Sequence, residues 1–113
     1  SQVVKKLKTF GFEAFHLEDL TVLDQASLFH GASHIVSTHG AGLSNLCFCE
    51  PHTKVIELFN PFHFHCLYWS LSDFLNLDYY YSIHNSTCEF EDKSSSIKVD
   101  LSRLNDIIKH ACR

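Results

Sequence analysis

Long apolar runs and net positive charge are both missing from this sequence. No stretch approaches the about 20 consecutive apolar residues that a membrane-spanning helix needs, and no signal-peptide pattern opens the chain. Nine Lys and Arg stand against thirteen Asp and Glu, which gives a formal charge of -4 with neutral histidines. Because nucleic-acid binding depends on Lys and Arg that neutralise phosphates, we expect no nucleic-acid partner and no membrane span in this chain.

Several motifs of reactive or metal-binding side chains are also absent. The five cysteines form no CxxC pair, which disfavours a disulfide framework and a structural zinc site. No GxSxG string is present, which disfavours a hydrolase with a serine nucleophile. His63 and His65 have no third ligand nearby in sequence, so we predict no bound metal. We predict no other cofactor either. Cys47 and Cys49 lie in an apolar run and are expected to be buried small hydrophobes.

The chain does contain enough apolar material for one small domain. It has 113 residues, of which 45% are hydrophobic and ten are Phe, so a core can form. The sequence contains no Met, and its first residues already have the pattern of a helix. We therefore expect a fragment of a longer protein.

Apolar periodicity and turn residues predict alternating helices and strands. Gly11 is expected to end the first helix, Thr21 to cap the start of the second and Gly31 to end it, and Asp100 or Ser102 to cap the last. Helices are expected over residues 3–10, 23–30, 42–49, 67–75 and 104–112, and strands over residues 12–17, 34–38, 54–59, 79–83 and 97–99. The alternation predicts an α/β, Rossmann-like three-layer sandwich, with a mostly parallel sheet and helices on both faces.

A glycine-paired turn follows the strand expected over residues 34–38. Gly40 and Gly42 carry no side chain that would keep a diphosphate away, and the helix that follows leaves backbone N–H groups unpaired at its start. The string from Gly40 to Asn45 nearly matches GxGxxG, with Asn45 in place of the third glycine. Asn45 could donate its amide to a phosphate or sugar, or could simply hydrogen-bond the turn.

His39 and Glu57 are the candidate polar side chains beside this turn. An imidazole at His39 could stabilise charge on a departing diphosphate, or could tie the strand end to the loop. Alternation along the strand places Val55 and Glu57 on one side and Ile56 and Leu58 on the other. A carboxylate there can accept hydrogen bonds from ribose hydroxyls, whereas the alternative is a surface acid paired with a lysine.

A long run of residues resembles the C-terminal signature of family 61 glycosyltransferases, the DUF563 or capsular-polysaccharide-like group. The run extends from Leu28 to Leu46, includes His39-Gly40-Ala41-Gly42-Leu43, and continues through Pro51 to Phe59. The resemblance spans roughly residues 3–83. It implies that residues 1–113 are part of the C-terminal, nucleotide-sugar-binding domain of an inverting, two-domain GT-B enzyme without a bound metal. His39, Gly40, Ala41, Gly42 and Asn45 would then face the donor diphosphate, and Glu57 the ribose or sugar.

The expected partners follow from this resemblance. They are a nucleotide-sugar donor of UDP type and a glycan, lipid-linked or protein acceptor, and surfaces left by a missing domain could pair two copies. We expect a cytoplasmic protein if the source is bacterial and one in the secretory-pathway lumen if it is eukaryotic. The alternatives are a noncatalytic Rossmann-like binding or oligomerisation module and a nicotinamide-dependent oxidoreductase.

Overall fold

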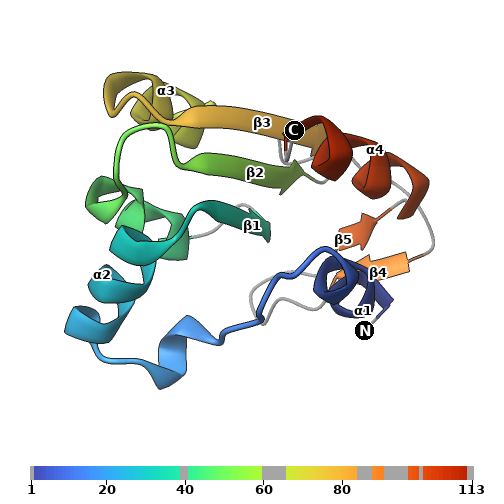
Figure 1. Cartoon of the computed structure of the whole chain (residues 1–113), viewed down its shortest axis with the longest axis horizontal. Helices are drawn as coiled ribbons and strands as arrows, with labels where there is room; N and C mark the ends of the chain where they lie inside the picture. The colour runs from blue at the N-terminus through green and yellow to red at the C-terminus, as the bar shows by residue number, and fades with distance from the viewer. Residues whose placement is uncertain are drawn as a thin grey trace.

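Three parallel strands lie side by side in the order β1–β2–β3 and form the main sheet of the computed structural model (Figure 1). The strands are β1 (His34–Thr38), β2 (Lys54–Phe59) and β3 (Asp78–Ile83). The structure describes residues 2–38, 41–59, 66–83, 88–90, 97–99 and 101–111. Within these residues the architecture is α/β with an open, all-parallel three-stranded sheet, so the predicted Rossmann-like fold class is confirmed.

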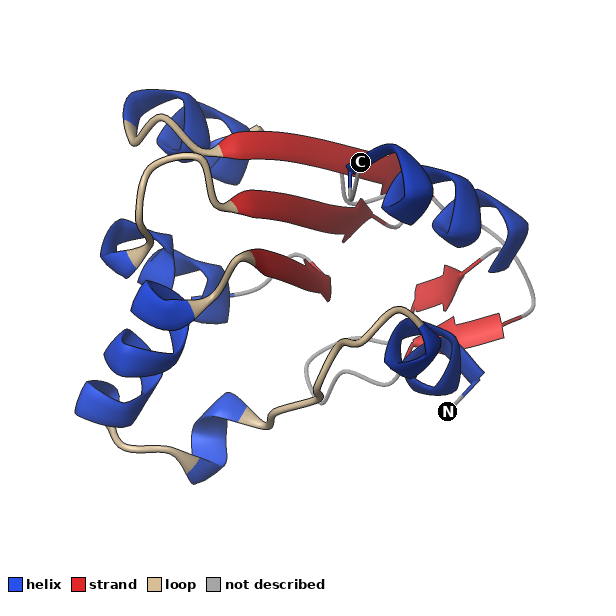
Figure 2. Ribbon diagram, viewed as in Figure 1, coloured by secondary structure: helices blue, strands red, loops and turns tan. Residues whose placement is uncertain are grey.

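Helical segments connect and flank the strands (Figure 2). They are α1 (Gln2–Thr9), η1 (Leu17–Asp19), α2 (Val22–Gly31), η2 (Ala41–Phe48), α3 (Leu67–Phe74) and α4 (Leu101–Ala111), of which η1 and η2 are 3₁₀ helices. A separate antiparallel pair is made by β4 (Cys88–Phe90) and β5 (Ile97–Val99). The predicted arrangement of parallel strands connected by helices is therefore found in the main sheet, whereas β4 and β5 are antiparallel.

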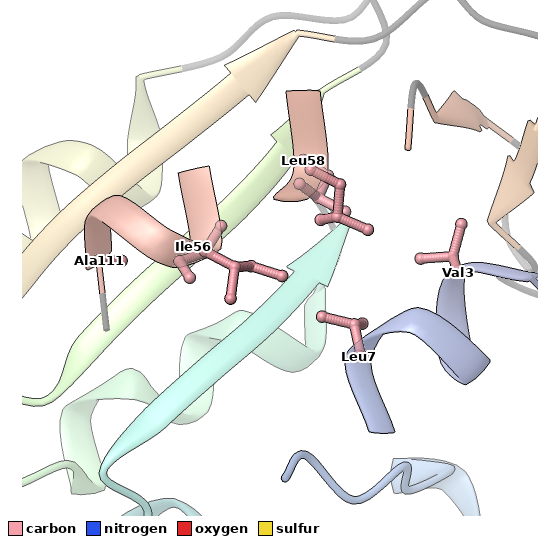
Figure 3. Packing of buried hydrophobic residues seen from close by; sticks show 7 residues of the cluster. Val3, Leu7, Ile56, Leu58 and Ala111 are labelled. Atoms are coloured by element: carbon pink, nitrogen blue, oxygen red, sulfur yellow. The ribbon is translucent and has the colours of Figure 1, made fainter. Parts of the chain in front are cut away.

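One face of the sheet is covered by α1 and α4. Ile56 and Leu58 of β2 point to this face and pack with buried apolar residues of the two helices (Figure 3). The helix residues in this cluster are Val3, Leu7, Leu104, Ile108 and Ala111. Helices that lie far apart in the sequence thus share one apolar layer, and burial of this layer is the main stabilising contribution on that side.

The opposite face is covered by α2, η2 and α3. Val55 of β2 packs there with Leu43 and Leu46 of η2, Phe29 of α2 and Tyr68 of α3. Because neighbouring residues of a strand point to opposite faces, Val55 and Ile56 belong to different clusters. The sheet is therefore the middle layer between two sets of helices.

The ends of two helices are set by local side chains and backbone, as predicted. The Thr21 hydroxyl accepts a hydrogen bond from the Asp24 backbone N–H at 3.1 Å and caps the start of α2. Gly11 adopts φ of 91° after α1, and the Phe12 N–H donates back to the Leu7 carbonyl at 3.2 Å. This is the left-handed glycine end that the sequence predicts.

The strand predicted over residues 12–17 is wrong. Residues 12–16 form no strand, and the chain continues into η1, where Asp19 and Leu20 donate to the carbonyls of His16 and Leu17 at 3.0 Å. The side chain of Gln25 also occupies the Leu17 and Leu20 carbonyls. Local hydrogen bonds therefore replace the ladder that a strand would need.

The helix predicted over residues 42–49 forms as a 3₁₀ helix over Ala41–Phe48, and this changes which residues are buried. With three residues per turn, Leu43, Leu46 and Cys49 fall on one side and contribute to the core cluster. Cys47 lies on the other side and is exposed, so its predicted burial is wrong, while Cys49 is half-buried. Burial raises the pKa of the Cys49 thiol to about 11, with the nearby Cys47 thiolate adding to the shift.

The last helix starts earlier than predicted, at Leu101 rather than residue 104. Ser102 therefore lies inside the first turn instead of capping it, and the other cap candidate, Asp100, lies outside the described residues. Leu104 and Ile108, one turn apart, both face the core and form the apolar face of the helix.

Candidate functional site

The carboxyl ends of the three parallel strands meet at one edge of the sheet, which is where ligands bind in open α/β sheets. β1 ends at Thr38, and η2 begins at Ala41 just beyond that edge. Ala41 and Gly42 thus form the first turn of η2. His39 and Gly40 lie outside the described residues, and their predicted roles stay predictions.

Glu57 is fully buried in the second half of β2, with 0% exposure. It pairs in register with Ser37 of β1 on one side and Tyr81 of β3 on the other. The alternative of a surface acid is therefore wrong, and Lys54 instead pairs with Asp78, with 3.5 Å between Nζ and Oδ2. The predicted alternation is confirmed, because Val55 packs on the η2 and α3 face whereas Ile56 and Leu58 pack on the other.

The Tyr79 hydroxyl donates a hydrogen bond to Oε1 of Glu57. Burial of a carboxyl group is unfavourable without hydrogen-bond donors, and Tyr79 replaces one of the donors that water would provide in solution. Burial raises the pKa of Tyr79 strongly, and the hydrogen bond and the charge of Glu57 add to the shift. The phenol therefore stays protonated and remains a donor at neutral pH.

Two further tyrosines surround this pair. Tyr68 of α3 is buried, and its pKa is raised first by burial and then by the Glu57 charge. The Tyr81 ring stacks against Tyr79, with ring centroids 6.4 Å apart, and is 51% exposed. The Tyr81 ring also forms a T-shaped pair with the ring of Phe59, with centroids 6.3 Å apart. The buried carboxyl thus lies beside an aromatic group that reaches the surface.

The sequence interpretation identified Glu57 but missed the tyrosines. The run Tyr79-Tyr80-Tyr81 indicates a strand, and its alternation puts Tyr79 and Tyr81 on one face. What the run could not supply is the register of β3 against β2, which pairs Val55 with Tyr79 and Glu57 with Tyr81. That register brings the hydroxyl of Tyr79 to the acid.

The Asn45 side chain contacts α2 across the interface between η2 and α2. Its side-chain nitrogen donates to Oε1 of Gln25 at 2.9 Å. The amide of Asn45 is expected from the sequence to bind a phosphate or sugar, or to hydrogen-bond its own turn. The hydrogen bond to Gln25 is neither, because it joins η2 to another helix, α2. Gln25 is a residue that the sequence interpretation did not single out.

The part of the chain that the structure describes contains no group of three or more His, Cys, Asp or Glu side chains placed to hold a metal ion. His63 and His65 lie outside it. No described helix combines the length and the apolar character that crossing a membrane requires.

Comparison with known proteins gives one family match. The family model described as Glycosyltransferase 61 matches residues 1–56. A search of curated proteins finds no match. The matched segment contains β1, the glycine turn, η2 and the first half of β2, and it ends one residue before Glu57.

Proposed function

Because the chain belongs to the glycosyltransferase 61 family, we propose that it is the donor-binding part of an inverting enzyme that transfers a sugar from a nucleotide-diphosphate sugar. The acceptor would be a hydroxyl of a glycan, a lipid-linked molecule or a protein. The general function of the family supports a sugar donor and an acceptor as partners. The residues of the site support the donor side of the reaction.

The observation that carries this proposal is the fully buried Glu57 in the second half of β2, beside the strand that leads into the glycine turn. A carboxylate accepts two hydrogen bonds well, and the adjacent hydroxyls of a ribose or sugar are suitable donors. The bond from Tyr79 fixes one of the carboxyl oxygens of Glu57. A buried acid needs polar partners, and the hydroxyls of a ligand would add to the partner that Tyr79 supplies.

The diphosphate would bind at the turn formed by His39, Gly40, Ala41 and Gly42, with Asn45 one turn further along η2. Negative charge develops on the leaving diphosphate as the bond from the sugar to the phosphate oxygen breaks. Backbone N–H groups at the start of η2, together with His39, would stabilise that charge by hydrogen bonding. The acceptor hydroxyl also needs a general base, which we assign to none of these residues.

Calorimetric titration with UDP, GDP and NADH tests the proposal. UDP binding supports a uridine-based donor site, and GDP binding in its place supports a guanosine-based donor. Binding of NADH alone would instead favour a nicotinamide-dependent oxidoreductase. Binding of none of the three would favour a noncatalytic module and contradict the donor site.

Replacement of Gly42 by Val tests the turn itself. The branched side chain would occupy the space of the diphosphate, so we expect UDP affinity to fall by at least about tenfold while circular dichroism stays that of the folded protein. Gly31→Val is the matched control, because a Cβ added at Gly31 meets no atom of another segment of the chain within 4 Å. Equal UDP affinity in Gly42→Val and wild type would count against the turn.

A further inference from the structure

Gln25 of α2 uses both ends of its side-chain amide. Its nitrogen donates to the carbonyl of Leu17 at 2.8 Å and to that of Leu20 at 3.2 Å. Its oxygen accepts from the side-chain nitrogen of Asn45 at 2.9 Å. Three segments that are separate in the chain, η1, α2 and η2, are thus joined through one half-buried side chain.

The orientation of this amide is determined by its partners. The Leu17 and Leu20 carbonyls can only accept hydrogen bonds, so the nitrogen of Gln25 must face them. The oxygen of Gln25 must therefore face Asn45. Glutamate at this position could accept from Asn45 but could donate to neither carbonyl, so the arrangement requires an amide.

The helix that carries Gln25 is itself held in place. Its first turn is capped by the Thr21 hydroxyl, and the Gln25 backbone N–H donates to the Thr21 carbonyl at 2.9 Å. Phe29, one turn further along α2, packs with Leu43 and Leu46 of η2 in the core. The amide of Gln25 thus projects from a helix that already contacts η2.

Apolar packing and the amide bond constrain η2 in different ways. Contacts of Leu43 and Leu46 fix how near η2 lies to α2, but the hydrophobic effect has no direction. A hydrogen bond is directional, and the one from Asn45 acts on a different side of the 3₁₀ helix from Leu43 and Leu46. It therefore restricts the rotation of η2 about its own axis, and with it the direction of the N–H groups in the first turn.

We propose that Gln25 is a positioning residue for the donor diphosphate, which it orients indirectly by holding Asn45 and so the first turn of η2. The inference rests on the proposed donor site. Gln25 itself does not touch the ligand. Its effect on binding passes entirely through Asn45, and this distinguishes a positioning role from a general contribution to folding.

Gln25→Met tests the proposal, because Met keeps the length of the side chain and removes all three hydrogen bonds. UDP affinity is measured by calorimetry and the free energy of unfolding by urea denaturation. We expect UDP affinity to fall by about tenfold in the folded variant. Thr21→Ala is the matched control, since it weakens the same helix by removing its cap but leaves Gln25 and Asn45 in contact. It should lower stability and leave UDP affinity within about twofold of wild type.

A double-mutant cycle with Asn45→Ala supplies the readout that a purely structural role would not change. If Gln25 acts through Asn45, the double variant should bind UDP no more weakly than Asn45→Ala alone. Full additivity of the two affinity losses would overturn the proposal. If Gln25→Met does not fold, Gln25→Leu replaces it in the same cycle with the same expectation, because Leu also removes the acceptor for Asn45.

The failure of this inference can be separated from the failure of the donor site. Wild-type protein that binds UDP, together with unchanged affinity in Gln25→Met, overturns the role of Gln25 and leaves the donor site in place. Wild-type protein that does not bind UDP overturns the donor site on which the role depends.

Discussion

The two faces of the central strand differ in chemistry although they are made by consecutive residues. Ile56 and Leu58 face α1 and α4, where the buried cluster is wholly apolar. Glu57, between them, faces the side of η2 and α3 and is bonded by Tyr79. One face therefore stabilises the sheet, and the other holds a polar group whose burial is unfavourable unless its partners are in place. The difference indicates where function would lie.

The η2 and α3 face also contains a buried hydroxyl without a partner. Among the described residues, Ser72 of α3 is fully buried and its Oγ has no recorded hydrogen bond. Such a group lowers stability compared with an apolar atom in the same place. On the apolar face, by contrast, the buried cluster of described residues consists of hydrocarbon side chains. We therefore expect substitutions on the apolar face to lower the free energy of unfolding without changing UDP affinity, and substitutions on the other face to act through its buried polar groups.

The largest effect is expected from Leu58→Ala on the apolar face. Removing this fully buried side chain should lower the free energy of unfolding by about 3 kcal/mol, through lost burial and a cavity. Urea denaturation measures the loss. UDP affinity of the folded protein should remain within about twofold, because Leu58 points away from Glu57. A large loss of affinity in folded protein would show that the two faces are not separate.

A smaller loss is expected from Tyr79→Phe on the opposite face. The carboxyl group of Glu57 loses a donor while the ring remains, so we expect the free energy of unfolding to fall by about 2 kcal/mol. Tyr80→Phe is the matched control, since Tyr80 faces the other cluster and contacts His110 through its ring. It should change stability by less than about 0.5 kcal/mol. Equal losses in both variants would contradict the assigned bond.

The smallest effect, and one of opposite sign, is expected from Ser72→Ala. Removing a buried hydroxyl that has no partner should raise the free energy of unfolding by about 1 kcal/mol. Ser70→Ala on the exposed side of the same helix reports the gain from helix propensity alone, a few tenths of a kcal/mol. Urea denaturation of the two variants separates these contributions. A loss of stability in Ser72→Ala would reveal a partner for its hydroxyl.

Elements with a strong local pattern could be predicted from the sequence. The strands over residues 34–38 and 54–59 have the bounds expected, since each is a short β-branched or apolar run between turn residues. The Thr21 cap and the glycine end at Gly11 also follow from local chemistry. Within the site, alternation was enough to place Glu57 on the opposite side from Ile56 and Leu58.

What could not be predicted depends on contacts between distant residues. The bond from Asn45 to Gln25 spans 20 positions, and the bond from Tyr79 to Glu57 spans 22. Both require the packing of α2 on η2 and the register of β3 on β2. The strand expected over residues 12–17 failed for a more local reason, since the chain turns into η1 and the Leu17 carbonyl accepts from the side chain of Gln25, eight positions away.

The central claim is that the polar face of the sheet binds a nucleotide diphosphate through Glu57. Titration of UDP into wild-type protein and Glu57→Gln tests it most directly, because Gln keeps the shape of the side chain and can still accept from Tyr79. Binding to wild type with an affinity about tenfold weaker in Glu57→Gln is the predicted result, since a neutral amide is the weaker acceptor for sugar hydroxyls. Equal affinity in the two proteins, or no binding to wild type, would contradict it.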